Sequence, residues 1–373
     1  RRYRRHNAAR SYVENEFFAA LARSHQSEPD PENVQYRLRR DPKISEALER
    51  MWPVLTPAQF LRDLFGSKAL LASASTGLLS EDKWSTLFRP RGDSVSDYRW
   101  SDADVPLLDE AYAGLGPRLD RQRKPRDPEV RTFGHIVIDE TQDHTPMALR
   151  MIARRSLNGS MTLVGDIAQA TAPGAAANWE EVLTHLPCGS NEPRVRELTL
   201  SYRIPAPNLE LANKVLALAA PDLATPKAVR SVGSPPRIIE VDGGELAPIE
   251  RLVERSVEIV EEESEALGGG SVAIVAPESV IDLIDAALEA RSIDYGRATT
   301  ASRNVSGPLH PKIALVPVQL VKGLELDGTV VIEPATILAE EPQGLRALFV
   351  ALTRSTKRLA VVHARSLPEV LQD

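Results

Sequence analysis

Residues 136–143 (IVIDETQD) decide the fold that the sequence predicts. Three consecutive apolar residues followed at once by acidic and polar ones are typical of a strand buried on both faces in a parallel sheet. In open α/β folds, ligands bind at the carboxyl ends of such strands. One carboxylate there can bind Mg²⁺, and its neighbour can orient or deprotonate an attacking water. We therefore expect an α/β protein with Asp139 and Glu140 at the ligand-binding edge of its sheet.

The next apolar run along the chain has the same layout. Residues 163–169 (LVGDIAQ) place a glycine and polar residues directly after an apolar strand. Gln169 is then expected to hydrogen-bond the terminal phosphate of a bound nucleotide. Taken alone, Gly165 and Asp166 are equally consistent with a simple turn from a strand into a helix.

Apolar runs and helical patterns alternate from residue 134 onward, which predicts parallel sheets covered by helices on both faces. The expected strands, besides residues 136–138, are residues 161–164, 195–200, 237–241, 272–275, 313–316, 329–332 and 359–362. The expected helices are residues 146–157, 205–219, 245–267, 280–290 and 343–353. A turn-rich stretch at residues 186–193 is expected to link two sheets. Glu262 and Glu263 are expected to be solvated surface residues.

The N-terminal part is predicted to be helical. Within residues 1–50, five apolar residues are spaced to form one helix face: Tyr12, Val13, Phe17, Phe18 and Leu21. The same segment holds an arginine cluster at positions 1, 2, 4, 5 and 10, which fits either a solvated helix face or a nucleic-acid contact. More helix is expected over residues 53–119, with N-caps at Thr56 and Ser80, followed by a loop at residues 120–131.

Composition limits the class of protein further. With 373 residues, 42% of them hydrophobic and 26% charged, the chain is long and apolar enough for several packed domains. Its net charge of −7 gives no support to a surface that coats nucleic acid, apart from a local basic groove. The single cysteine, Cys188, excludes an intramolecular disulfide and is expected to be a buried or incidental thiol. No apolar run approaches the roughly 20 residues that span a bilayer, so a cytoplasmic protein without membrane contact is expected.

Five segments carry a family resemblance. They occur in the order of motifs II to VI of superfamily 1 helicases of the UvrD/Rep/PcrA kind: residues 139–143 (DETQD), 165–169 (GDIAQ), 200–204 (LSYRI), 322–327 (KGLELD) and 350–354 (VALTR). Further stretches resemble the bacterial HelD proteins, a branch that acts on RNA polymerase: residues 52–57 (WPVLTP), 61–66 (LRDLFG), 146–151 (PMALRM), 159–162 (GSMT) and 165–171 (GDIAQAT).

The resemblance implies an architecture of RecA-like P-loop NTPase domains with parallel sheets. Residues 1–50 would be the helical tail of an inserted arm. Residues 51–190 would be the C-terminal part of domain 1A, with motifs II and III. Residues 191–373 would be a complete domain 2A, with motifs IV, V and VI.

The resemblance also implies roles for individual residues, with ATP and Mg²⁺ as cofactors. Asp139 would bind Mg²⁺, and Glu140 would activate the hydrolytic water. Gln169 would sense the γ-phosphate, which Arg203 and Arg354 would reach as arginine fingers. The nucleotide-binding residues would be Gln142, Gly323 and Glu325, of which Glu325 would contact the ribose.

The sequence departs from the helicase pattern in three places. Residues 170–174 (ATAPG) stand where related helicases have base-stacking aromatics, and Pro317 and Gln319 replace the Thr and His that usually open motif V. These two changes weaken the case for a motor that tracks DNA. The third is that none of the 21 glycines is followed by lysine, so the phosphate-binding P-loop is missing. Because the chain also starts with Arg1 rather than Met, we expect an N-terminal remainder to supply that loop.

Three functions remain open at this point. The favoured one is the C-terminal part of a HelD-like ATPase that binds RNA polymerase and couples ATP binding and hydrolysis to its release or recycling from nucleic acid. The alternative is a 3′–5′ DNA helicase of the UvrD/Rep kind that moves on single-stranded DNA. The third is a truncated protein that only docks to a partner. The isolated chain is expected to be inactive in hydrolysis because it lacks the P-loop.

Overall fold

The computed structural model describes residues 5–24, 31–92, 94–118, 130–172, 174–187, 192–241, 248–299 and 312–372. Internal contacts divide the chain into two compact units. The first comprises Arg1–Val137, Pro146–Thr162 and His185–Pro187, and the second comprises Ile138–Thr145, Leu163–Thr184 and Cys188–Asp373. Cys188, most of the expected loop at 120–131 and part of the expected linker at 186–193 lie outside the described residues. The division at residue 190 therefore stays a prediction.

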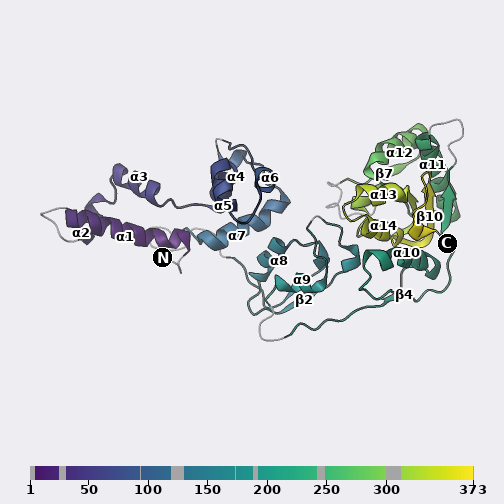
Figure 1. Cartoon of the computed structure of the whole chain (residues 1–373), viewed down its shortest axis with the longest axis horizontal. Helices are drawn as coiled ribbons and strands as arrows, with labels where there is room; N and C mark the ends of the chain where they lie inside the picture. Colours follow the sequence, from purple (N-terminus) through teal and green to yellow (C-terminus); the bar gives the residue numbers. More distant parts are fainter. Residues whose placement is uncertain are drawn as a thin grey trace. The chain divides into compact units, whose positions relative to one another are not determined.

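The first unit begins with three helices, as predicted: α1 (His6–Ser24), α2 (Pro31–Leu38) and α3 (Pro42–Met51) (Figure 1). Their small core forms around Phe18, with Phe17 and Leu21 packed against it. Tyr12 stays about half exposed, so the predicted apolar face does not extend over the whole of α1. Tyr12 is not part of the apolar core that α1 shares with α2 and α3.

A second helical cluster of this unit consists of α4 (Pro57–Phe65), α5 (Lys68–Ser75), α6 (Glu81–Ser85) and α7 (Val105–Leu115). The predicted N-cap Thr56 is confirmed, because its side chain and that of Gln59 form a reciprocal capping box. Ser80 lies at the N-cap of α6 but makes no capping side-chain hydrogen bond. The buried Asp104 accepts two hydrogen bonds from Arg89, at 2.8 and 2.9 Å, which lower the pKa of its carboxyl to about 2.

The strands β1 (Ile136–Ile138) and β2 (Met161–Leu163) form a two-stranded sheet, and α8 (Pro146–Ala153) connects them. Both strands were predicted, and α8 ends earlier than expected. The division between the two units passes through these strands. One expectation is wrong here: β1 is not buried on both faces, because Val137 keeps 66% of its surface exposed.

The second unit contains a six-stranded sheet in the order β5-β10-β9-β6-β8-β7, with every described pairing parallel (Figure 1). Its strands are β5 (Arg237–Glu240), β6 (Val272–Ala276), β7 (Tyr295–Arg297), β8 (Ile313–Pro317), β9 (Leu326–Ile332) and β10 (Ser355–His363). This sheet confirms the predicted α/β class.

Helices cover both faces of this sheet. Side chains that alternate along each strand join two different cores, as the two-residue period of a strand requires. Val331 packs with α10 (Ala206–Ala219) and α14 (Gly344–Leu352), whereas Val330 and Ile332 pack with α11 (Pro248–Ala266) and α12 (Glu278–Ala290). Two further helices, α9 (Trp179–Thr184) and α13 (Pro334–Glu340), were not predicted.

Two further expectations about the second unit are wrong. Of the strand expected at residues 195–200, only β3 (Leu200–Ser201) forms, and it pairs with the unpredicted β4 (Lys227–Ala228). Glu263 is not a solvated surface residue, because it is only 2% exposed and pairs with Arg237 and Arg358. Burial alone would raise the pKa of its carboxyl, but these two arginines lower it below the ordinary value.

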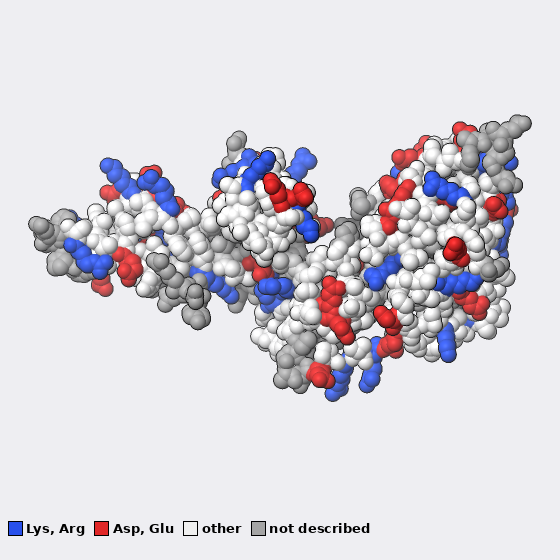
Figure 2. All heavy atoms as spheres, in the orientation of Figure 1, with Lys and Arg blue, Asp and Glu red and all other residues white. Residues whose placement is uncertain are grey.

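On the face shown in Figure 2, basic and acidic side chains are interspersed over both units. Among the described residues, no helix is both long and apolar enough to cross a lipid bilayer.

Candidate functional site

All eight predicted site residues lie in the second unit, and four of them, Asp139, Glu140, Gln142 and Gln169, follow the ends of β1 and β2. Glu140 follows β1 in the left-handed backbone region, at φ 48°, which costs a non-glycine residue on the order of 1 kcal/mol. Local hydrogen bonds hold it there. The Asp139 Oδ1 atom accepts the Glu140 amide at 2.8 Å, and Gln142 Nε2 donates to Glu140 Oε2 at 2.6 Å. The Glu140 carboxylate is therefore fixed in direction while half of its side chain stays accessible.

Gln142 joins the two strand ends. Its side chain is fully buried, and its Oε1 atom accepts the amide of Asp166 at 3.0 Å. A Cβ atom on Gly165 would lie 2.3 Å from that same oxygen, so only glycine leaves room for the contact. Thr141 adds a second link by donating its hydroxyl to the carbonyl of Val164 at 2.8 Å. Gln142 therefore supports Glu140 from within the protein rather than presenting its own side chain at the surface.

Gln169 contacts side chains from two segments of the chain, the one that follows β2 and the one that precedes β10. Its Nε2 atom donates to Asp166 Oδ2 at 2.7 Å, and its Oε1 atom accepts from Arg354 Nη2 at 3.1 Å. Arg354 comes from the C-terminal end of α14, just before β10. The structure thus brings together Gln169 and Arg354, which are far apart in the sequence.

Arg354 is the most unusual charged group of the site. Its guanidinium also donates to the Val350 carbonyl and the Thr353 hydroxyl, and only 6% of the residue is exposed. Within the described part of the chain, no carboxylate lies within ion-pair distance of it. Burial, and after it the charge of Arg203, lowers the pKa of Arg354 to about 10. The group stays positively charged at neutral pH and hydrogen-bonds only neutral acceptors, while the charges of Asp166 and Glu140 act on it without a direct bond. Because none of its direct partners is an anion, the guanidinium can accept one.

Lys322, which was not assigned a role from the sequence, also reaches this site. Its Nζ atom donates to Asp143 Oδ1 at 2.8 Å and to the Gln169 carbonyl at 2.7 Å, and lies 3.6 Å from Glu140 Oε2. The side chain is only 10% exposed. Lys322 opens the segment 322–327, but only the folded structure brings that segment against residues 140–143.

Arg203 and Glu325 form an ion pair with each other, and both side chains are more than half exposed. Among the described contacts, neither side chain hydrogen-bonds Gln169 or Arg354, although the charge of Arg203 acts on Arg354. Gly323 has a φ of 78°, which favours glycine. Tyr202, directly before Arg203, is 68% exposed and was not singled out from the sequence. The sequence signal that could have indicated Tyr202 is an aromatic residue directly before an arginine at the end of an expected strand.

Asp139 is the predicted Mg²⁺ ligand. In the described residues, no group of three His, Cys, Asp or Glu side chains is arranged to hold a metal ion. Mg²⁺ at phosphate-transfer sites takes one or two carboxylates, with phosphate oxygens and water as the other ligands. The exposed Asp139 at the end of β1 fits that requirement when a nucleotide supplies the remaining oxygens.

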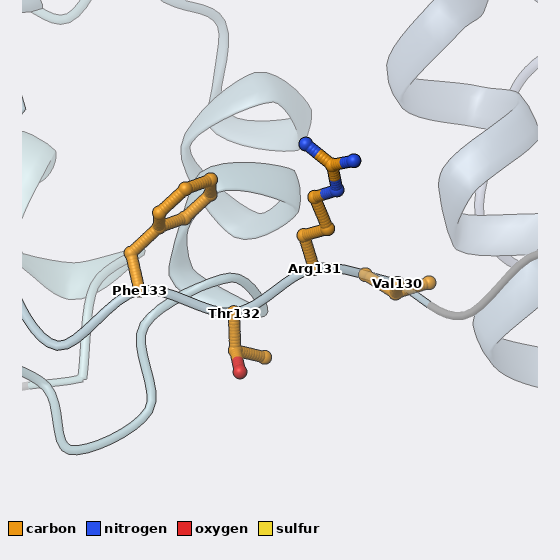
Figure 3. Close-up of a pocket in the computed structure, with 4 residues that line it drawn as sticks. All are labelled: Val130, Arg131, Thr132 and Phe133. Carbon is orange, nitrogen blue, oxygen red and sulfur yellow. The ribbon is translucent and has the colours of Figure 1, made fainter.

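A separate pocket lies in the first unit. The described residues that line it are Val130, Arg131, Thr132 and Phe133, and Arg131 and Phe133 point to the same side of the segment (Figure 3). None of the predicted site residues belongs to it, so it is distinct from the site around Arg354.

Comparisons with known proteins give weak similarities only. No protein-family model matches the chain, and no curated protein matches it. The C-terminal domain of a possible DNA helicase from Lactobacillus plantarum WCFS1 is 20% identical with a TM-score of 0.32, over 46% of this chain and 92% of that one. The SWI2/SNF2 ATPase core of Sulfolobus solfataricus in complex with double-stranded DNA is 12% identical with a TM-score of 0.26, over 35% of this chain and 28% of that one.

Proposed function

We propose that the chain is part of a RecA-like, P-loop ATPase of the helicase type, and that the γ-phosphate of ATP binds beside Arg354. The observation behind this proposal is the buried Arg354 guanidinium, which is charged at neutral pH and hydrogen-bonds Gln169 and other neutral acceptors only. A phosphate would supply a directly bonded negative charge, which none of these partners carries.

The proposed roles follow from position. Glu140, fixed by Gln142 at the end of β1, orients and deprotonates the attacking water. Asp139 holds Mg²⁺, which when bound neutralises charge on the phosphates. Gln169 connects the phosphate to Arg354. Lys322 neutralises Glu140 and Asp143 when no nucleotide is bound.

The exposed ion pair between Arg203 and Glu325 would lie on the other side of the bound nucleotide. Arg203 turns to the phosphate and Glu325 to the ribose, which requires their mutual ion pair to open. Gly323 leaves space beside the nucleotide, because no atom lies within 4 Å of the place its Cβ would take. The exposed ring of Tyr202 provides a surface on which a base can stack.

The P-loop would come from a segment outside these 373 residues that pairs with the small sheet. Apolar residues of that sheet, β1-β2, are exposed: Val137 in β1 and Val164 directly after β2. Exposed apolar strands with open edges are surfaces on which further strands pair. This arrangement would place the phosphate-binding loop next to Asp139 and Glu140.

Mg²⁺-dependent ATP hydrolysis tests the proposal. The protein that includes the P-loop segment should hydrolyse ATP, and the 373-residue chain alone should show negligible turnover. Measurable Mg²⁺-dependent turnover by the chain alone would contradict the assignment of the P-loop to another segment. No nucleotide binding by the longer protein would contradict the ATPase itself.

For the partner, we infer RNA polymerase rather than DNA. Gln319 stands where a DNA-contacting side chain is expected, and its amide donates to Glu341 at 2.6 Å. Burial, together with Glu340 and Glu278, raises the pKa of Glu341, so acidic groups gather at this position. Such groups disfavour a phosphate backbone.

Two measurements separate these partners. Co-purification with the polymerase core is expected for the protein with its P-loop segment, and absence of binding would reject the polymerase proposal. ATPase activity strongly stimulated by single-stranded DNA, with binding that weakens steeply with salt, would instead support the DNA helicase alternative.

A further inference from the structure

The segment that contains β4 runs alongside the segment that carries Arg203. β3 and β4 pair in parallel, and the backbone hydrogen bonds continue beyond them. The amide of Val229 donates to the Ser201 carbonyl at 2.9 Å, and the amide of Ala206 donates to the Arg230 carbonyl at 2.9 Å. Residues 227–230 therefore lie alongside the segment that contains Arg203, from β3 to the first turn of α10.

The side chain of Arg230 connects this segment to a second one. Its Nη1 atom donates to the Arg203 carbonyl at 2.7 Å and to the Thr356 carbonyl at 2.6 Å. The two hydrogens of one guanidinium nitrogen can satisfy both carbonyls. Thr356 lies close after Arg354 in the chain, so Arg230 joins the backbone of Arg203 to the backbone that follows Arg354.

An independent contact lies deeper in the fold. Asn208, in the first turn of α10, donates its amide to the hydroxyl of Ser355 at 3.0 Å, and both side chains are fully buried. Ser355 directly follows Arg354. Arg230 at the surface and Asn208 in the interior therefore connect the same two segments.

These connections act against a repulsion. Arg203 and Arg354 are both positively charged, and the charge of Arg203 lowers the pKa of Arg354. Two like charges near each other separate unless the backbone prevents it. We propose that Arg230 is a positioning residue that holds Arg203 and Arg354 at a fixed separation, so that both reach one phosphate group; this inference rests on the proposed ATPase function.

Hydrogen exchange in the 373-residue chain tests the contact without requiring activity. Arg230→Ala removes both side-chain hydrogen bonds, and amide exchange across residues 199–206 and 354–358 should become about five- to ten-fold faster. Arg230→Lys, which keeps a charged donor, should recover part of the protection. The matched control is Arg251→Ala, an exposed arginine whose ion pair is with Glu254 on its own helix α11. Unchanged exchange in either segment of Arg230→Ala would overturn the proposal.

Kinetics of the protein with its P-loop segment test the positioning role. For Arg230→Ala, kcat should fall by about ten- to a hundred-fold while the KM for ATP changes little, because misplaced arginines act on the transition state. Arg230→Lys should restore part of kcat, and thermal unfolding should shift no more than in Arg251→Ala. An unchanged kcat, or an equal loss in Arg251→Ala, would overturn the proposal. If the wild-type protein does not hydrolyse ATP, the proposed function fails, and the exchange experiment alone decides whether Arg230 joins the two segments.

Discussion

Two sheets of this protein, the pair β1-β2 and the six-stranded sheet, have the same kind of sequence and very different surroundings. Val330 in β9 and Val137 in β1 both lie in short continuous apolar runs, yet Val330 is fully buried and Val137 is 66% exposed. Helices cover both faces of the six-stranded sheet, whereas in β1 the described residues bury Ile138 but leave Val137 exposed. An apolar run therefore predicts a strand, but whether that strand is buried depends on what else packs against it.

The chemistry is divided between the two sheets as well. The ends of β1 and β2 provide Glu140 and Gln169, while the well-packed sheet provides Arg354 and Lys322. We expect substitutions of the site residues, which stand at strand ends of both sheets, to affect activity, and substitutions of apolar side chains inside the large sheet to affect stability.

The largest expected effect is on hydrolysis. In the protein with its P-loop segment, Glu140→Gln should lower kcat for ATP by about 10²- to 10⁴-fold, the usual contribution of a general base. Nucleotide affinity should stay close to the wild-type value, because the substitution keeps the shape of the side chain. Steady-state kinetics and nucleotide titration measure the two quantities. Glu180→Gln, an exposed glutamate of α9, is the control and should change neither.

The next effect concerns the stability of the large sheet. Ile274→Ala in β6 should lower the free energy of unfolding by about 2–5 kcal/mol, because this fully buried side chain leaves a cavity between α11 and α12. Ile238→Ala in the edge strand β5 is the matched control, since Ile238 is partly exposed. Denaturant unfolding gives both values. Equal losses at the two positions would mean that the centre of the sheet is no better packed than its edge.

A smaller effect depends on pH in the first unit. The depressed pKa of Asp104 means that its pair with Arg89 stabilises the fold above about pH 4, and this contribution is lost as pH falls towards 2. Asp104→Asn should therefore cost about 1–2 kcal/mol at neutral pH, because partial exposure of Arg89 screens the pair. The difference from wild type should shrink as pH falls towards 2 and disappear only below it, because Asp104 is still about half ionised at pH 2.

Thermal unfolding between pH 2 and 7 measures the effect of Asp104→Asn. The exposed neighbour Asp102 is the control, and Asp102→Asn should be neutral throughout. A wild-type advantage that does not shrink between pH 4 and pH 2 would show that the ion pair is not its source.

The smallest effect compares the two sheets directly. Val137→Thr should change the stability of the chain by less than about 0.5 kcal/mol, because the hydroxyl faces water. The same substitution at Val330 should cost about 1–3 kcal/mol, because it buries a hydroxyl. If further strands cover β1 in the longer protein, Val137→Thr should become costly there. A neutral result in that protein would argue against the covering strands.

Much of the large sheet could be predicted from the sequence, because five of its six strands contain apolar runs between helical patterns. The sixth, β7, was not predicted, because Tyr295–Arg297 (YGR) has no such run. The strand expected at residues 195–200 and the burial expected for β1 were both wrong for one reason. A sequence pattern does not show which other segment covers a strand. Glu263 was wrongly placed at the surface, because Arg237 and Arg358 are distant in sequence and only the fold brings them together.

The residues of the site could be predicted from the sequence, but the contacts between them could not. The resemblance to helicase motifs indicated Gln169 and Arg354 separately, and the structure brings them within 3.1 Å. Nothing in the sequence predicted that Lys322 would reach Asp143, or that Arg203 and Glu325 would pair. Contacts between distant segments depend on the register of the strands that present them, which local patterns do not encode.

The alternation along β9 has a consequence for insertions and deletions. Val330 and Ile332 join one core while Val331 joins the other. Removing one residue from the middle of β9 would exchange the two sets of side chains, so that every later residue would meet the wrong helices. The length of β9 is therefore constrained more tightly than its composition. One apolar residue can often replace another, but no single substitution restores the alternation once the strand is one residue shorter.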